Sequence, residues 1–216
     1  MTEQPPKYPA ETASDEYALA LGYFVREWNW LQDKLLDLFS TLLEPVRFSV
    51  SAAIWYSIQS DRAQRGMLVA AAEQLFKPEP KSDPKDPRSK LAARYLSEIK
   101  WIVGQCNRLG SQRDDAAHTP VSMMLDDPPV AVSKHFYGHP RAQTLKGKKL
   151  KDEFALYRAD ARALKDYAHK VEEHFRFFIR GAPLDELPPL PDKPRLLASE
   201  KKKIIGSGQT RSSVPK

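Results

Sequence analysis

A repeat of bulky apolar residues near the N-terminus constrains the fold more than any other feature of this chain. Along residues 17–42 these residues recur at alternating intervals of four and three, which places them on one stripe of a long α-helix. The stripe consists of Tyr17, Leu21, Phe24, Trp28, Leu31, Leu35, Leu38 and Leu42. Thr12 or Ser14 can cap the start of this helix, and Pro45 prevents its continuation. A stripe of this length requires a partner helix, in the same chain or in a second copy.

Helical spacing recurs in three later segments, which we expect to form helices over about 49–76, 89–109 and 150–180. We expect Gly110 to end or bend the third of them. The last one carries the longest second stripe, made of Phe154, Tyr157, Ala161, Leu164, Ala168, Val171, Phe175 and Phe178. The sequence therefore predicts an all-α fold, an up-down bundle of four to five helices.

The segments between the helices define the predicted domain organisation. Residues 1–13 are expected to be flexible, and one helical domain is expected over 14–181, with a solvated loop at 77–88 and an insert at 121–150. The insert contains β-favouring residues around a pair of prolines, so a small hairpin is a possible structure for it. Residues 182–216, proline-rich and then basic, are expected to form a flexible tail.

Positive charge is concentrated in the insert and in the tail. The chain has 34 Lys and Arg against 28 Asp and Glu, a formal charge of +6, and residues 187–216 alone contribute +5. Residues 128–151 hold six basic residues and no acid, interleaved with aromatic residues. Such a segment can bind a nucleic-acid backbone and stack bases, and it can equally be a solvated loop. The candidate RNA-binding residues are Lys134, His135, Arg141, Lys146, Lys148 and Lys149.

Cysteine and hydropathy patterns exclude several classes of protein. Cys106 is the only cysteine, so an intrachain disulfide is impossible and a cysteine-based zinc site is not expected. No 18-residue apolar run and no secretory signal are present, so we expect a cytoplasmic protein without a membrane partner. Two histidine pairs, His135 with His139 and His169 with His174, lack the further ligands that complete a zinc site. We therefore expect no metal and no other cofactor.

A small polar cluster follows the third predicted helix, in the segment SQRDDAAHTP at residues 111–120. His118 can transfer a proton in the attack of a ribose 2′-hydroxyl on the adjacent phosphate, and Arg113 can hold the phosphate oxygens as charge develops. On an ideal helix these two side chains are about 140° apart around the axis, so they converge only if the turn is distorted or if each faces a second copy. The alternative is a capped surface turn in which Asp114 or Asp115 accepts backbone hydrogen bonds.

Arg113, Asp114 and His118 match the Arg-polar-x3–5-His motif of the HEPN superfamily, which this chain resembles over roughly residues 15–180. The resemblance implies a bundle of four or five helices, usually dimeric, with the motif at the dimer cleft. Many HEPN proteins are metal-independent endoribonucleases of toxin–antitoxin, abortive-infection or CRISPR-linked defence systems. By resemblance, Arg113 and His118 are catalytic residues and Asp114 orients them. Asp114 stands where Asn is the commoner residue.

Two functions are therefore open from the sequence. The first is a cytoplasmic, homodimeric endoribonuclease that acts on RNA in a bacterial toxin–antitoxin, phage-defence or stress system, with a cognate antitoxin or regulatory protein as a further partner. The second is a non-catalytic HEPN-like helical module that binds a partner protein or a nucleotide. A third interpretation, without either function, is a plain helical bundle that serves as a scaffold.

Overall fold

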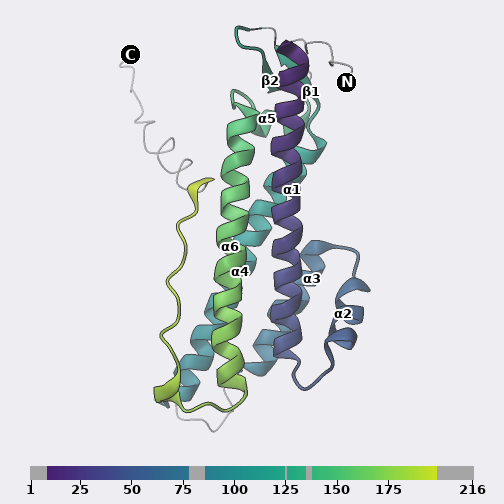
Figure 1. Cartoon of the computed structure of the whole chain (residues 1–216). Helices are drawn as coiled ribbons and strands as arrows, with labels where there is room; N and C mark the ends of the chain where they lie inside the picture. The colour runs from purple at the N-terminus through teal and green to yellow at the C-terminus, as the bar shows by residue number, and fades with distance from the viewer. Residues whose placement is uncertain (1–8, 78–85, 125, 135–137, 199–216) are drawn as a thin grey trace, which may run out of the picture. The chain divides into compact units, whose positions relative to one another are not determined.

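The computed structural model describes residues 9–77, 86–124, 126–134 and 138–198, and it confirms the all-α prediction (Figure 1). No helix in these ranges is both long and apolar enough to cross a membrane. The helices are α1 (Pro9–Leu42), α2 (Phe48–Tyr56), α3 (Asp61–Leu75), α4 (Pro87–His118), α5 (Pro140–Thr144) and α6 (Leu150–Ile179). A hairpin of β1 (Val121–Met124) and β2 (Val130–Ser133) interrupts them, and a 3-10 turn, Leu184–Glu186, follows α6.

The chain divides into two compact units. The hairpin unit contains residues 1–26, 112–160 and 195–216, and the bundle unit contains residues 27–111 and 161–194. Helices α1, α4 and α6 contribute residues to both units.

In the bundle unit, the stripe of α1 forms the core. Trp28, Leu31, Leu35 and Leu38 are buried there, together with the predicted inward residues of α4 and α6. These residues of α4 and α6 are Tyr95, Ile99, Ile102, Cys106, Leu109, Leu164, Ala168, Val171 and Phe175. The prediction of one helical stripe is confirmed, and its partner helices lie in the same chain. The stripe is therefore not available to a second copy.

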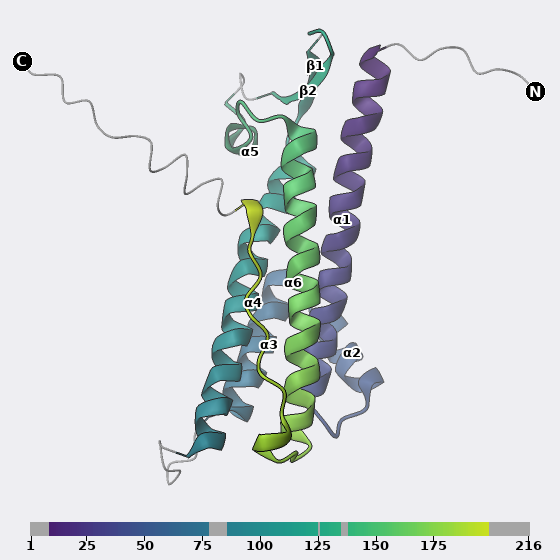
Figure 2. The ribbon, with the colours of Figure 1, turned by 60° about the vertical axis from the view of Figure 1, so that its left-hand side comes forward.

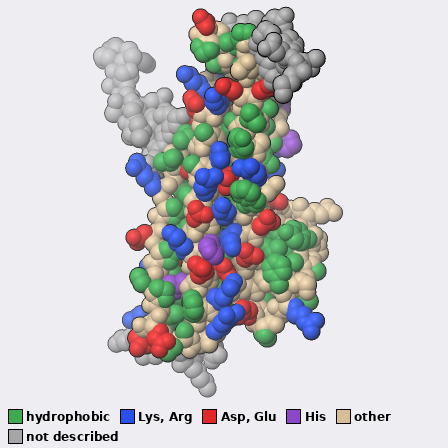
Figure 3. Space-filling model, in the orientation of Figure 1, with side chains coloured by type: hydrophobic (Ala, Val, Ile, Leu, Met, Phe, Trp, Pro, Cys, Tyr) green, Lys and Arg blue, Asp and Glu red, His purple; other side chains and the backbone are tan. Residues whose placement is uncertain are grey.

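The second predicted helix is in fact two helices, so that prediction is wrong at its centre. Helix α2 ends at Tyr56 and α3 begins at Asp61, where the Ser60 hydroxyl caps the new helix by accepting from the Ala63 N–H at 3.4 Å. The Gln64 amide closes the turn because it donates to the carbonyl oxygens of Trp55 (3.1 Å) and Ile58 (2.9 Å). Hydrophobic side chains gather on the outer surface of α2, where Phe48, Val50, Ile54 and Tyr56 are exposed (Figure 3).

The predicted break at Gly110 does not occur, because α4 runs without interruption to His118. A Cβ atom on Gly110 would lie 3.1 Å from Cη2 of Trp28 and 3.4 Å from Nη2 of Arg65. The close approach of a neighbouring ring favours glycine here, and no left-handed helix stop is involved.

The segments predicted to be flexible, 1–13 and 182–216, are ordered over residues 9–13 and 182–198, and their remaining residues lie outside the described part of the chain. Helix α1 begins at Pro9, so residues 9–13 are helical. Residues 187–194 run in extended form along α6 and α4 (Figure 2), where the Lys193 ammonium lies 3.1 Å from the Glu98 carboxylate and His174 contacts the Pro188 carbonyl. Composition predicts a flexible segment here, and tertiary contacts hold it instead. Most of the predicted loop at 77–88 lies outside the described residues, apart from its two ends.

In the hairpin unit, aromatic contacts join the first half of α1 to the first half of α6. The ring centroids of Tyr17 and Phe154 are 5.7 Å apart, and those of Phe24 and Tyr157 are 5.5 Å apart. The possible hairpin in the insert is present, with β1 and β2 antiparallel and Val121 paired with Ser133. Helix α5 was not predicted, although Pro140 at its first turn and His139 as its N-cap are ordinary start signals.

Candidate functional site

The predicted catalytic residues lie in the last two turns of α4, within the hairpin unit. Because the helix is regular, Arg113 and His118 stay about 140° apart around its axis. The distorted turn that could bring them together within one chain is therefore absent, and the other alternative, in which each faces a second copy, stays open. Asp114 and His118, in contrast, are four residues apart and lie on one stripe of the helix.

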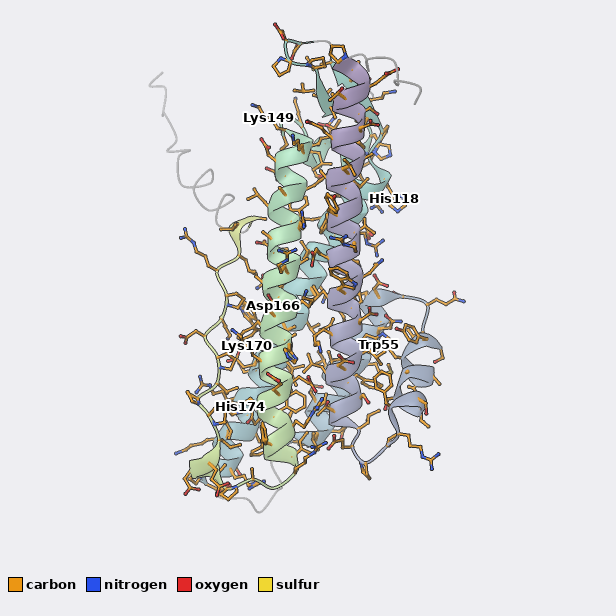
Figure 4. All side chains as sticks on the ribbon, in the orientation of Figure 1. Trp55, His118, Lys149, Asp166, Lys170 and His174 are labelled. Atoms are coloured by element: carbon orange, nitrogen blue, oxygen red, sulfur yellow. The ribbon has the colours of Figure 1, made fainter. Side chains whose placement is uncertain are left out.

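His118 is exposed and points away from the helices of the hairpin unit (Figure 4). It is the last residue of α4. An exposed imidazole at this position can reach a phosphate or a ribose in solution.

Arg113 is part-buried and bound to its neighbour. Its Nη1 lies 3.0 Å from Oδ1 of Asp114, and the two side chains are 29% and 44% exposed. The ion pair fixes the guanidinium near the Asp114–His118 stripe. It also offsets part of the positive charge that a phosphate would meet.

The rest of the segment is anchored to its own unit. The Thr144 hydroxyl, from α5, donates to the Asp115 carboxylate at 2.9 Å, a contact that no spacing in the sequence indicated. Ala116 is buried and Ala117 is exposed. Of the two alanines, only Ala117 is therefore open to a close approach by a substrate or a second chain.

Two buried polar atoms flank the motif. Gln112 Oε1 and Thr119 Oγ1 have no hydrogen-bond partner among the described residues. Buried polar atoms are rarely left unpaired in folded proteins. Ser51 Oγ in α2 is a further case among the described residues, so these atoms do not by themselves mark the motif.

The predicted RNA-binding residues differ in exposure, and Lys149 lies away from the motif residue His118. Lys134 and Arg141 are part-buried, Lys146 and Lys149 are exposed, and His135 lies outside the described residues. Lys149 and His118 point to opposite sides of the hairpin unit in Figure 4.

Lys148 is already engaged by its own unit. Its ammonium lies 3.2 Å from the Glu153 carboxylate, donates to the Tyr157 hydroxyl at 3.3 Å and lies over the Tyr157 ring. Because Glu153 is buried, this pair is shielded from water, and Lys148 is a weaker phosphate ligand than its exposed neighbours.

Other reactive groups offer no competing site. Burial raises the pKa of the Cys106 thiol to about 12, so the thiolate needed for nucleophilic chemistry does not form at neutral pH. No group of three or more metal-ligating side chains occurs in the part of the chain that the structure describes. His174 of the second histidine pair is buried against Tyr95, whereas His169 is exposed.

No protein-family model, curated protein or solved structure matches this chain.

Proposed function

We propose that this chain is a metal-independent endoribonuclease of the HEPN type. The observation that carries the proposal is the exposed end of α4, where Asp114 and His118 share one stripe and the Asp114 carboxylate holds the Arg113 guanidinium at 3.0 Å. Aspartates near a helix C-terminus oppose the helix dipole, so they cost stability at this place. A role in orienting Arg113 and His118 accounts for Asp114.

The proposed reaction is transesterification of RNA. A ribose 2′-oxygen attacks the adjacent phosphorus, its proton passes to a base, and the 5′-oxygen leaves with a proton from an acid, which gives a 2′,3′-cyclic phosphate. His118 transfers a proton and Arg113 stabilises the negative charge of the pentavalent phosphorus. One histidine does not serve as acid and base in the same step, so the proposal includes a homodimer that supplies His118 and Arg113 twice.

RNA would be held by the basic residues of the insert whose charge remains available. Lys146 and Lys149 are exposed, and Lys134 and Arg141 are partly so. Phosphate contacts of this kind are sequence-independent and weaken with salt. A cytoplasmic location, a role in toxin–antitoxin, defence or stress systems, and a cognate antitoxin or regulatory protein belong to this proposal.

A second candidate is a non-catalytic helical module that binds a partner protein or a nucleotide. The ion pairs of Arg113 with Asp114 and of Lys148 with Glu153 favour it, because both cations are engaged by carboxylates of the same chain.

RNA cleavage in the presence of EDTA separates the two candidates. We expect the wild-type protein to cleave single-stranded RNA to 2′,3′-cyclic phosphate ends, and we expect His118→Ala and Arg113→Ala each to lower the rate at least about 100-fold. The matched controls are His169→Ala and Arg62→Ala, an exposed histidine and an exposed arginine of the bundle unit, which should retain wild-type activity. Cleavage that survives both motif substitutions, or no cleavage of several RNAs by the wild type, would reject the nuclease.

A further inference from the structure

A shallow groove runs along one exposed face of α1 within the hairpin unit. It is lined by Asp15, Ala18, Leu19, Gly22, Tyr23 and Arg26, all of them exposed. Leu19 is 56% and Tyr23 41% exposed, values that are high for large apolar side chains on a long helix. This face lies away from the buried stripe of α1, and the described residues of the chain leave it exposed.

The residues that line the groove are complementary to those of a second copy of the same groove in antiparallel orientation. When two copies of this face are laid antiparallel about the point between Ala20 and Leu21, Asp15 meets the second copy's Arg26. Leu19 meets the second copy's Gly22, and Tyr23 meets the second copy's Ala18. Each large side chain faces a small residue and each charge faces its opposite. A two-fold interface requires this reciprocity, because the same patch must fit itself.

Packing and electrostatics support the same register. Gly22 and Ala18 leave room for the helix axes to approach to about 8 Å, the lower end of the usual range. A Cβ placed on Gly22 meets no atom within 4 Å, so nothing in its own surroundings requires glycine here. The guanidinium groups of Arg26 and Arg158 lie 5.1 Å and 4.8 Å from the centroid of the Tyr23 ring and hold the ring at the wall of the groove.

We infer that the occupant of this groove is a second copy of α1, packed antiparallel, so that the chain forms a two-fold homodimer through Asp15, Leu19, Gly22, Tyr23 and Arg26. The inference goes beyond the proposed function because it names the surface and the register of the dimer. It stands on the groove alone, and its test contains no RNA.

Charge reversal tests the register directly. We expect analytical ultracentrifugation at low salt to give wild-type particles of twice the 24.6 kDa chain mass. Asp15→Arg and Arg26→Asp each place like charges opposite one another and should weaken dimerisation at least about tenfold. The double variant restores opposite charges in swapped positions and should recover the dimer. Asp166→Arg, at an exposed aspartate of α6, is the control and should remain dimeric.

A second variant tests the packing without changing charge. Gly22→Leu fills the groove that receives the second copy's Leu19 and should give a folded monomer, as judged by circular dichroism. Gly104→Leu is the matched control, because Gly104 is also an exposed glycine within a helix whose Cβ would meet nothing within 4 Å. A monomeric wild type, a dimer that tolerates both single charge reversals, or a double variant that stays monomeric would overturn the inference.

Discussion

The buried Arg65 side chain contacts three other side chains of the bundle unit. It is buried, its Nε donates to Asn107 Oδ1 at 2.8 Å, and its Nη1 donates to Gln32 Oε1 at 3.1 Å. Its guanidinium also lies 5.3 Å from the centroid of the Trp28 ring. The planar guanidinium can satisfy these partners from one position, which an ammonium cannot.

We expect Arg65→Ala to lower the free energy of unfolding by about 3 kcal/mol, because it leaves two part-buried acceptors without this donor and opens a cavity beside Trp28. Urea denaturation followed by tryptophan fluorescence measures this change. Arg62→Ala, one turn earlier on α3 and exposed, should change the free energy by less than about 0.5 kcal/mol. Equal effects of the two substitutions would show that the buried contacts of Arg65 contribute nothing to stability.

At the scale of elements, the periodicity of apolar residues predicted the long helices, but it did not predict helix boundaries at which single side-chain contacts occur. The stripes of α1 and α6 were readable because each spans many turns. At the break between α2 and α3 the Gln64 amide donates to two carbonyl oxygens, and within α4 Gly110 packs against the Trp28 ring. The spacing of apolar residues encodes neither the side-chain hydrogen bonds of Gln64 nor the packing of Gly110 against Trp28. The spacing of Arg113 and His118 gave their separation around a regular helix, but it did not show that α4 continues through Gly110 to His118.

The segment after α6 is a second place where composition alone predicted the structure wrongly. The Asp160 carboxylate of the hairpin unit binds the end of this segment. Asp160 accepts from the N–H groups of Leu197 at 2.7 Å and Ala198 at 3.3 Å, and Leu196 and Ala198 are buried. A composition rich in proline and charge predicted flexibility here. The backbone hydrogen bonds to a buried carboxylate oppose it.

Asp160→Ala should release residues 195–198. Hydrogen bonds to a charged group contribute about 1.5–3 kcal/mol, so local opening should become at least about tenfold more frequent. Limited trypsin digestion with mass spectrometry measures this as faster cleavage after Arg195. Asp166→Ala, at an exposed aspartate of the same helix, should cleave at the wild-type rate. Cleavage of Asp160→Ala at that same rate would mean that other contacts hold the segment.

At the scale of the whole molecule, stability in alkaline solution depends on two buried tyrosines. Burial raises the pKa of Tyr95 well above its usual range, and burial together with a hydrogen bond to Glu98 does the same for Tyr167. The Tyr167 hydroxyl donates to Glu98 at 2.8 Å, and the Tyr95 hydroxyl lies 2.5 Å from His174 Nδ1. Both hydroxyls therefore keep their protons in the folded state at a pH where an unfolded chain has released them.

The higher pKa of these two tyrosines in the folded state determines how stability changes with pH. Below the unfolded pKa of about 10, both states are protonated and the stabilisation is fully present. Above it the unfolded state is favoured by proton release, so each tyrosine lowers the free energy of unfolding by up to about 1.4 kcal/mol per pH unit until the folded pKa is reached. Urea denaturation at about pH 8, 10, 11 and 11.5 should show a steep loss above the unfolded pKa. Tyr167→Phe should reduce that slope by up to about 1.4 kcal/mol per pH unit, whereas Tyr23→Phe, at an exposed position, should leave it unchanged. A slope that Tyr167→Phe does not reduce would contradict this account, because the alkaline loss would then come from other groups, such as the lysines.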